Sequence, residues 1–294
     1  CIRDRNFILA VSNVIAPGRS SVIQNEISRG IYSGLTGEKA KAAYTMVIGI
    51  CAELSFFVFN DKKLNKSNYL LILLYFLATM LTSKRMLCVI ILLEIGVALK
   101  LFDFKSKSVK IILGGAIALV AVFVITITIP QTSNIVDRFM EASEDTSAGG
   151  RLMFWNYCIE MFKDKPIIGY GINTFNKAFS DNVGYVYQGS RWNMYAHSMY
   201  YELLGETGIV GIVLFGFFMF YSLVYSLRLF KNSCLSNVWK GLLWFSISLQ
   251  ILFIVYGYSG NVLYDKAQLF TYLSSISMLI AVSYHAFNEK EISI

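Results

Sequence analysis

Long runs of apolar residues alternate with shorter polar segments along most of the chain. A membrane-spanning helix needs roughly 20 mostly apolar residues, and seven runs come close to that length. They lie at residues 42–59, 69–83, 86–102, 110–130, 208–229, 239–258 and 267–287. The pattern predicts an all-α fold, namely a polytopic membrane helical bundle.

The polar segments divide this bundle into parts. We expect a polar leading segment at 1–41, transmembrane helices at 42–130, a long loop at 131–207 and transmembrane helices at 208–294. The chain starts with Cys1 and its first residues lack the pattern of a signal peptide. We therefore expect that an N-terminal part is missing.

Two features stand out between the predicted spans. The second and third spans are joined only by residues 83–85, so they should form a tight helical hairpin with Lys84 and Arg85 at its tip.

The long loop should contain short helices. The first is predicted over 150–163, because apolar residues recur there every three or four positions, at Leu152, Trp155, Ile159 and Phe162.

Composition supports the membrane assignment. Hydrophobic residues make up 55% of the 294 residues and charged residues 15%, whereas a soluble domain carries about 25% charged residues. The mean hydropathy is +0.54. The five cysteines show no metal-like or redox spacing and are interpreted as inert thiols.

Charge predicts the orientation. The net charge of +7 comes from Lys-rich and Arg-rich short loops, such as 60–68, and such loops are typically cytoplasmic. The long loop 131–207 should then be extracytoplasmic, where it carries nine acids against six cations. Since the basic residues are explained by topology, we expect no nucleic-acid partner.

His197 is the candidate catalytic residue of the long loop. A neutral imidazole can accept a proton from a hydroxyl and act as a general base. A surface histidine that caps a helix is the structural alternative. If a helix ran on from Ala196, the eleven residues to Gly208 would make almost three turns and put both residues on one face. Glu202 and Glu206 are the nearest carboxylates in sequence.

Arginines supply candidate phosphate ligands, because the planar guanidinium matches phosphate oxygens. Arg85 lies at the hairpin tip, Arg151 opens the amphipathic helix, and Arg191 lies in the long loop. Arg151 precedes Trp155 by four residues and could stack on its ring. Snorkelling and plain solvation are the alternatives. The predicted site thus has His197, Arg151 and Arg85 as catalytic residues and Arg191, Trp155 and Gly208 as substrate-binding residues.

These motifs together resemble the superfamily of O-antigen ligases and Wzy-type polysaccharide polymerases. The resemblance covers roughly residues 69–230 and depends on the order of four pieces. They are Thr82-Ser83-Lys84-Arg85, Gly150-Arg151-Leu152 with Trp155, Pro166-Ile167-Ile168-Gly169-Tyr170-Gly171 with Phe175, and Ala196-His197-Ser198 through Glu206-Thr207-Gly208-Ile209-Val210-Gly211.

The resemblance implies an integral-membrane glycosyltransferase of the bacterial inner (plasma) membrane that works on glycans linked to undecaprenyl pyrophosphate. It implies no metal ion and no cofactor. The family's arginines match Arg85 and Arg151, and its histidine matches His197. The partners would be a lipid-linked donor and acceptor, membrane lipid and a chain-length regulator protein.

Three activities stay open on the sequence. The first is a polymerase of O-antigen or capsular repeat units, and the second is a ligase that transfers the glycan to lipid A core or to protein. The third is a transporter of lipid or polysaccharide, which would place polar residues near the bilayer midplane. Glu53 and Glu94 are the acids within predicted spans that would serve it.

Overall fold

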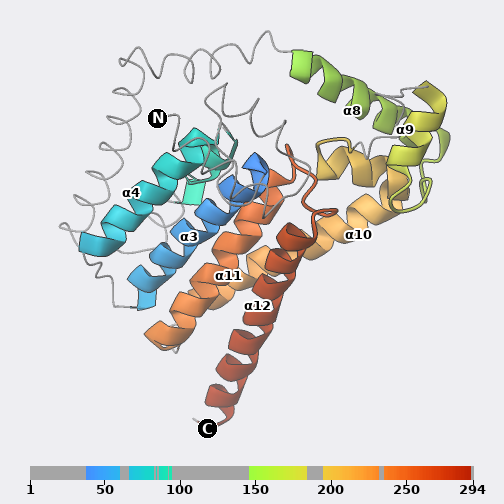
Figure 1. Ribbon diagram of the computed structural model, residues 1–294. Coiled ribbons are helices and arrows are strands. Elements are labelled where there is room, and N and C mark those ends of the chain that lie inside the picture. The colour runs from blue at the N-terminus through green and yellow to red at the C-terminus, as the bar shows by residue number, and fades with distance from the viewer. Residues whose placement is uncertain are drawn as a thin grey trace, which may run out of the picture. The chain divides into compact units, whose positions relative to one another are not determined.

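The computed structural model describes residues 38–59, 66–82, 84, 86–91, 93–94, 146–183, 195–231 and 235–292. All regular structure in these ranges is helical (Figure 1), which confirms the predicted all-α class. The chain divides into two units. The first comprises residues 1–142 and 236–245, and the second comprises 143–235 and 246–294.

The first unit contains α3 (Lys39–Phe59) and α4 (Lys66–Leu81), which pack against each other. Their contact is close at Gly49, where an added Cβ would lie 2.8 Å from the ring of Tyr75. Ser55 Oγ donates to the carbonyl of Gly241 at 2.6 Å, which joins α3 to the first turns of α11 (Asn237–Tyr256). Helices of this unit therefore approach through small side chains, as is common between membrane helices.

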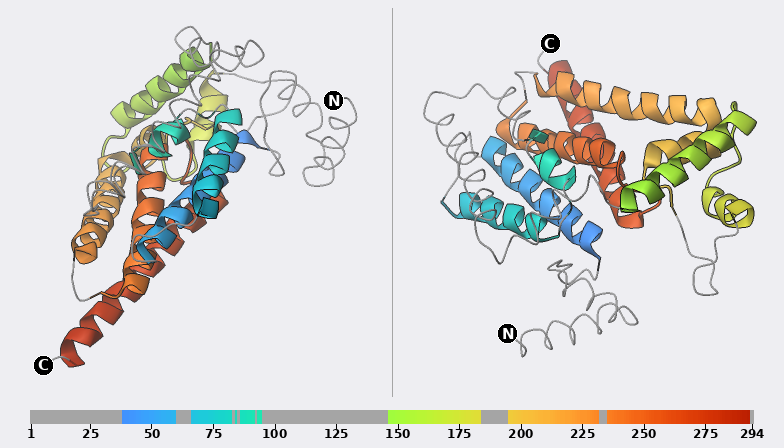
Figure 2. Two further views of the ribbon diagram at one scale, coloured as in Figure 1. Left: turned by 90° about the vertical axis from the view of Figure 1, so that its left-hand side faces the viewer. Right: turned by 90° about the horizontal axis from the view of Figure 1, so that it is seen from above.

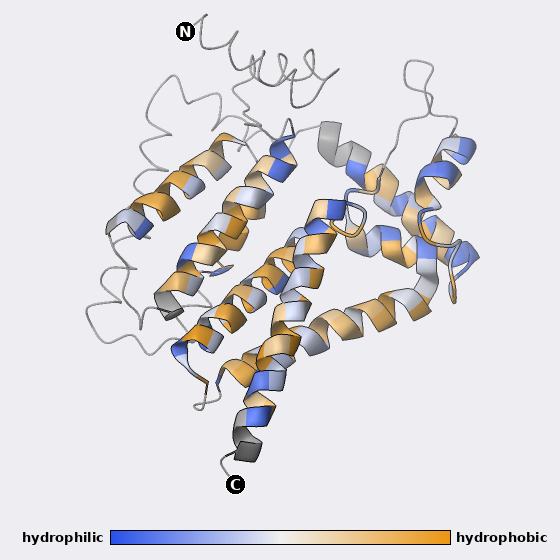
Figure 3. Cartoon of the chain, turned by 60° about the horizontal axis from the view of Figure 1, so that its bottom comes forward, coloured by the Kyte–Doolittle hydropathy of each residue, from blue (hydrophilic) through white to orange (hydrophobic). Residues whose placement is uncertain are grey.

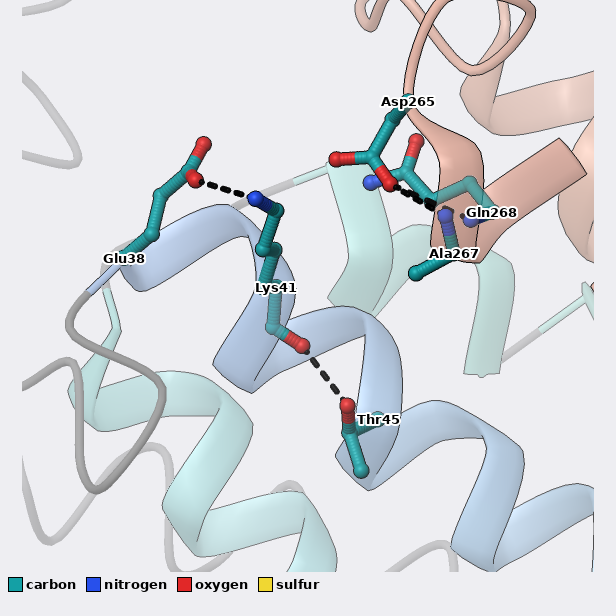
Figure 4. A network of polar contacts seen from close by, with 6 residues as sticks. All are labelled: Glu38, Lys41, Thr45, Asp265, Ala267 and Gln268. Carbon is teal, nitrogen blue, oxygen red and sulfur yellow. Dashed lines mark hydrogen bonds and ion pairs between the residues drawn. The ribbon is translucent and has the colours of Figure 1, made fainter. Parts of the chain in front are cut away.

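The predicted acids of the first unit are buried. Glu53 on α3 accepts a hydrogen bond of 2.6 Å from Asn68 Nδ2 on α4, and Glu94 is fully buried. The first turn of α3 is closed by an ion pair of 3.0 Å between Lys41 and Glu38, and Thr45 Oγ1 donates to the Lys41 carbonyl (Figure 4).

Around the hairpin predicted after the second span, the structure describes helix on both sides of the tip, and the hairpin itself stays a prediction. Helix α4 ends at Leu81, and Thr82 closes its last turn by donating from Oγ1 to the Thr79 carbonyl at 2.6 Å. Residues 86–91 are helical again. Arg85, the candidate residue at the tip, lies outside the described residues, as does the whole predicted span 110–130.

The second unit contains α8 (Thr146–Asp164), α9 (Phe175–Val183), α10 (Met199–Phe230), the remainder of α11 and α12 (Lys266–Ile292). Helix α8 packs against α10 (Figure 2). Helix α12 begins with a side-chain cap, because Asp265 Oδ1 accepts from the backbone N–H groups of Ala267 and Gln268 (Figure 4).

Three of the described helices are long and apolar enough to cross a membrane. They are Met199–Phe230, Asn237–Tyr256 and Lys266–Asn288. These helices confirm the last three predicted spans, and the hydropathy colours of Figure 3 show α10 becoming largely apolar along its length. Helix α4, at 16 residues, falls short of a full span.

Helix α8 confirms the predicted helix, and Trp155 of the predicted apolar stripe packs against the core, whereas Leu152 does not. Leu152 is 55% exposed. The buried residues are Cys158 and Met161, with Phe154 packed beside them. Leu152 is left outside because α8 packs on α9 and α10 through aromatic rings, and the spacing of apolar residues along one helix does not show where its partners lie.

An aromatic core joins α8, α9 and the segment before α10. Cys158, Met161, Phe175, Phe179 and Ala196 form its buried centre. The rings of Phe154 and Phe179 meet edge to face at 5.0 Å, and those of Phe175 and Phe179 stack at 5.7 Å. Such ring pairs stabilise a core beyond the apolar area that they bury. The core holds α8 and α9 as a rigid base for the segment that carries His197.

Candidate active site

Helix α10 is bent at Gly208, where the backbone has φ 61° and ψ −161°. Only glycine adopts this conformation readily. The helix also begins at Met199, so His197 precedes its first turn. The hypothesis that one continuous helix sets His197 and Gly208 on the same face is therefore wrong. The bend arises because Gly208 faces the backbone of another segment.

That segment is the connection between α8 and α9. The carbonyls of Pro166 and Ile167 accept hydrogen bonds from Ile209 N at 2.8 Å and from Val210 N at 3.2 Å. An added Cβ at Gly208 would lie 2.5 Å from the Ile167 carbonyl oxygen. The N–H groups left open where α10 resumes are thus satisfied by a neighbouring loop.

Gly169 makes the reciprocal approach. It has φ 66°, and an added Cβ would lie 2.3 Å from the carbonyl oxygen of Glu206. Gly171 N donates to the same carbonyl at 2.7 Å. The two glycine-containing motifs of the sequence, 166–171 and 206–211, therefore pack directly against each other, and the buried Gly208 serves that packing.

The carboxylate of Glu206 organises the other side of this junction. It is fully buried and accepts from Asn173 N at 2.7 Å, from Phe175 N at 2.8 Å and from the Tyr264 hydroxyl. Three donors around one buried carboxylate stabilise the charge that burial would otherwise penalise. The bonds fix the start of α9, α10 and the turn before α12 relative to one another.

The Tyr264 hydroxyl remains a hydrogen-bond donor to Glu206. Burial raises the pKa of its phenol, and the hydrogen bond to Glu206 and the negative charges of Glu206 and Glu202 raise that pKa further. The phenol therefore stays protonated at all physiological pH values. Its ring also stacks on Tyr195 at 5.9 Å, which connects the group to the segment that carries His197.

Glu202 and Trp155 hold the residue before His197 from two sides. Glu202, which is buried, accepts from Ala196 N at 2.9 Å through Oε2. Trp155 Nε1 on α8 donates to the Ala196 carbonyl at 2.9 Å. Both backbone groups of Ala196 are thereby bonded to side chains of different helices, so the peptide units beside His197 are fixed.

His197 itself is exposed and has φ 55°, in the left-handed region. Few residues other than glycine occupy this region, and such strain concentrates at functional sites. On its other side, Met199 N donates to the carbonyls of Gly257 and Gly260 at 2.8 and 3.1 Å. The imidazole lies 6.2 Å from the Phe154 ring, centroid to centroid. The result is a solvent-accessible imidazole on a strained, firmly bonded turn.

Arg151 lies on α8 and is partly exposed. It precedes Phe154 and Trp155 by three and four residues, so these side chains share one face of the helix. The ring of Trp155 is stacked on Tyr201 at 4.7 Å rather than on Arg151. One face of the Trp155 ring is thus taken by Tyr201 of α10, and the Arg151–Trp155 stack stays a prediction.

A comparison with known families identifies the family of the chain. A family model described as O-antigen ligase matches residues 70–216, half of the chain. The chain belongs to the O-antigen ligase family. A search of curated proteins finds no significant match.

The part matched by the O-antigen ligase family includes α8, α9, the His197 turn and the bend of α10. Together with the three apolar helices, it makes the protein a membrane enzyme of the O-antigen ligase and polymerase type, with lipid-linked glycans as its class of substrate. The family match also contains Arg85 and Arg191, which lie outside the described residues.

Several residues that build the site were missed by sequence reasoning. Asn173 and Tyr264 gave no signal, since their partner Glu206 is 33 and 58 residues away. Glu202 and Glu206 were named on the sequence as the carboxylates nearest to His197, but their burial and their hydrogen-bond partners were not.

Burial makes Cys158 an unreactive thiol. Burial raises its pKa, and the negative charges of Glu202 and Glu206 raise it further. A thiol with a raised pKa carries little thiolate and is a poor nucleophile. This supports the interpretation of Cys158 as an inert thiol.

Proposed function

We propose that the protein polymerises oligosaccharide repeat units carried on undecaprenyl pyrophosphate, as an O-antigen or capsular polysaccharide polymerase. The observation that carries this proposal is the exposed His197 on a strained turn whose neighbouring peptide groups are bonded to α8 and α10. A general base needs a fixed position and access to the acceptor hydroxyl, and this turn offers both.

In the proposed reaction, an acceptor sugar hydroxyl gives its proton to His197. The hydroxyl oxygen forms a bond to the anomeric carbon of the donor sugar while the bond from that carbon to the pyrophosphate oxygen breaks. A single displacement of this kind inverts the anomeric configuration. The proton then leaves the imidazolium to solvent or to the released pyrophosphate.

The arginines have the complementary task. Arg151 and Arg85 stabilise the negative charge that grows on the departing pyrophosphate, as a planar fork of donors suits phosphate oxygens. Arg151 shares a helix face with Phe154, whose ring contacts His197. Arg191 binds the substrate in the same loop, whereas Trp155 and Gly208 act on the substrate indirectly, through the shape of the His197 turn and of the bend.

Glu202 and Glu206 are poor substitutes for the base. Both carboxylates are buried; both oxygens of Glu206 accept hydrogen bonds from the backbone or from Tyr264, and Oε2 of Glu202 accepts from Ala196 N. A sugar hydroxyl would have to displace these bonds to reach them. We therefore assign them a positioning role, with Glu202 acting on the His197 turn and Glu206 on the α8–α9 connection.

The proposed setting is the bacterial inner membrane, with the segment 131–207 on the extracytoplasmic side. Donor and acceptor are then glycans on the same polyprenyl carrier, and a chain-length regulator is a protein partner. The alternation of Lys-rich loops and apolar runs supports this orientation.

A ligase that moves the finished glycan to lipid A core or to protein is the second candidate. It is favoured by the description of the matching family as O-antigen ligase. The two activities share the donor, the base and the leaving group, and they differ only in the acceptor.

The test is turnover by the purified full chain with lipid-linked repeat units extracted from the source cells. We expect His197→Ala to reduce the rate by about 10²- to 10⁴-fold, the usual contribution of a general base. Donor binding should change little. The matched control is His285→Gln at the far end of α12, which should leave the polymer ladder on a gel unchanged.

His197→Gln separates proton transfer from positioning. An amide can hold a hydroxyl but cannot take its proton near pH 7, so this variant should be as slow as His197→Ala. A near-normal polymer ladder from His197→Gln would contradict the role of His197 as a general base. If the glycan were instead transferred to a lipid A core acceptor and no polymer formed on the lipid carrier, the activity would be that of a ligase.

A further inference from the structure

The connection between α8 and α9 exposes an unusual amount of apolar surface. Ile167 is 64% exposed, Ile168 73% and Ile172 72%. Exposed single apolar residues are ordinary, but three isoleucines within six residues form a patch that normally marks a contact with protein or lipid. Neither α8 nor α9 covers these side chains.

The patch is rigidly tied to a membrane-spanning helix. Ile209 N and Val210 N, in the first turn of α10 after the bend, donate to the carbonyls of Pro166 and Ile167 at 2.8 and 3.2 Å. The backbones of the loop and of α10 approach each other so closely at Gly169 and Gly208 that the loop has no room to shift along the helix. The isoleucines therefore lie level with the point where the apolar part of α10 begins.

The surface of α10 continues the patch. Ile209, Val213 and Leu214 are also exposed, and Leu214 reaches 65%. Helix α10 has a mean hydropathy of 2.1 over its most apolar 18 residues, of which only 17% are buried. Within the described residues, protein covers little of this helix, which is typical of a span that faces lipid chains. The isoleucine patch adjoins this surface.

Polar residues next to the patch fit the boundary between lipid and water. The Tyr170 hydroxyl donates to Asp164, and Lys165 Nζ lies 4.3 Å from the centre of the Tyr170 ring. Tyrosine and lysine gather at this depth because each has an apolar body and a polar tip. The loop thus carries apolar side chains and interfacial anchors together.

We propose that the loop 165–172 inserts Ile167, Ile168 and Ile172 into the lipid interface beside α10, as a fixed membrane anchor of the catalytic segment. The occupant of the patch is bilayer lipid rather than a partner protein, because the patch is continuous with the lipid-covered surface of α10. The anchor would hold the His197 turn at a fixed distance from the bilayer, at the level where a lipid-linked pyrophosphate lies.

The test measures the depth of spin labels on the full chain in liposomes of phosphatidylethanolamine and phosphatidylglycerol. Cys1 and Cys234 are replaced by Ser, and the buried Cys51, Cys88 and Cys158 remain. Single cysteines at Ile168 and Ile172 then carry a nitroxide. Leu214→Cys is the lipid-facing reference and Asp181→Cys on α9 the aqueous reference. The parent without an added cysteine gives the background labelling.

We expect the labels at 168 and 172 to be more accessible to oxygen than to a water-soluble nickel complex, with the same sign of the depth parameter as at 214. The label at 181 should have the opposite sign. Labels at 168 and 172 that behave like 181 would overturn the proposal. So would labels shielded from both reagents, because that result means a protein partner. The readout is independent of turnover, so it stands or falls separately from the role of His197.

Discussion

The two parts of α10 differ in the side chains that they expose and in the polar residues that they bury. Before the bend, Glu202 and Glu206 are buried and their carboxylates accept hydrogen bonds from neighbouring segments. After the bend, large apolar side chains such as Leu214 and Phe217 are exposed, and the buried residues include Ser222 and Ser226. Figure 3 shows the same change, from mixed colours in the first turns to a mainly apolar helix.

The difference reflects two surroundings for one helix. The first turns pack inside a protein core, where a carboxylate is tolerated only with donors around it. The later turns face lipid, where apolar side chains need no protein cover and small polar residues mediate helix contacts. Gln250 of α11 illustrates the second case, since its Nε2 donates to Ser226 Oγ at 3.0 Å.

Breaking the junction between the two parts should have the largest effect. Gly208→Ala places a Cβ 2.5 Å from the Ile167 carbonyl oxygen in a conformation with φ 61°, which adds about 1–3 kcal/mol of backbone strain to a backbone clash. We expect almost no monodisperse protein by size exclusion of detergent extracts. Gly216→Ala, where an added Cβ meets nothing within 4 Å, is the matched control on the same helix. Equal recovery of the two variants would contradict the packing role.

Removing the central carboxylate of the first part should have an intermediate effect. Glu206→Ala leaves Asn173 N, Phe175 N and the Tyr264 hydroxyl without their acceptor. At about 1–3 kcal/mol for each unsatisfied group, the loss is at least about 3 kcal/mol. This corresponds to a fall of about 10 °C in the apparent melting temperature, measured by circular dichroism in detergent.

Glu160→Ala on the exposed side of α8 is the control for that measurement. It should melt like the parent chain, because its side chain is solvated. If both variants melted within a degree or so of the parent, Glu206 would not organise the junction.

A single hydrogen bond at the His197 turn should have the smallest effect on stability and a distinct effect on activity. Trp155→Phe removes the donor to the Ala196 carbonyl, which lies 2.9 Å away, and keeps an aromatic ring beside Tyr201. We expect a loss of about 1 kcal/mol in stability. The turnover number should fall several-fold with little change in KM, since the turn that presents the base is loosened.

Tyr157→Phe provides a comparison on the same helix. It removes the hydrogen bond of 2.7 Å to the Ala178 carbonyl and the one of 2.7 Å accepted from Asn182 Nδ2, both with α9 and away from the His197 turn. We expect a similar loss of stability with unchanged turnover. If the two variants changed turnover equally, the Trp155 bond would have only a structural role.

The sequence predicted the parts of the fold that depend on local composition. Runs of apolar residues identified α10, α11 and α12 as membrane helices, because the bilayer imposes a length and an apolarity that each helix must meet by itself. The order of short motifs around Arg151, His197 and Gly208 was enough to indicate the family that the comparison then showed.

The sequence predicted less of the site. The sequence indicated His197 through its chemistry and Trp155 through its spacing. It did not show which distant residues bond to Trp155 or to the turn that carries His197. Trp155 reaches the Ala196 carbonyl 41 residues later, and Tyr264 reaches Glu206 across 58 residues. Periodicity describes one helix at a time and carries no information on such pairs.

The amino-acid sequence by itself determined the helical class, the membrane-spanning helices α10, α11 and α12, and the family. Only the tertiary structure decided that Cys158 rather than Leu152 faces the core, that α10 bends at Gly208, and that Glu202 and Glu206 point inward. The physical reason is that helix formation and membrane insertion depend on neighbouring residues. The rotation of a helix and the satisfaction of a buried carboxylate depend on which distant backbone groups pack against it.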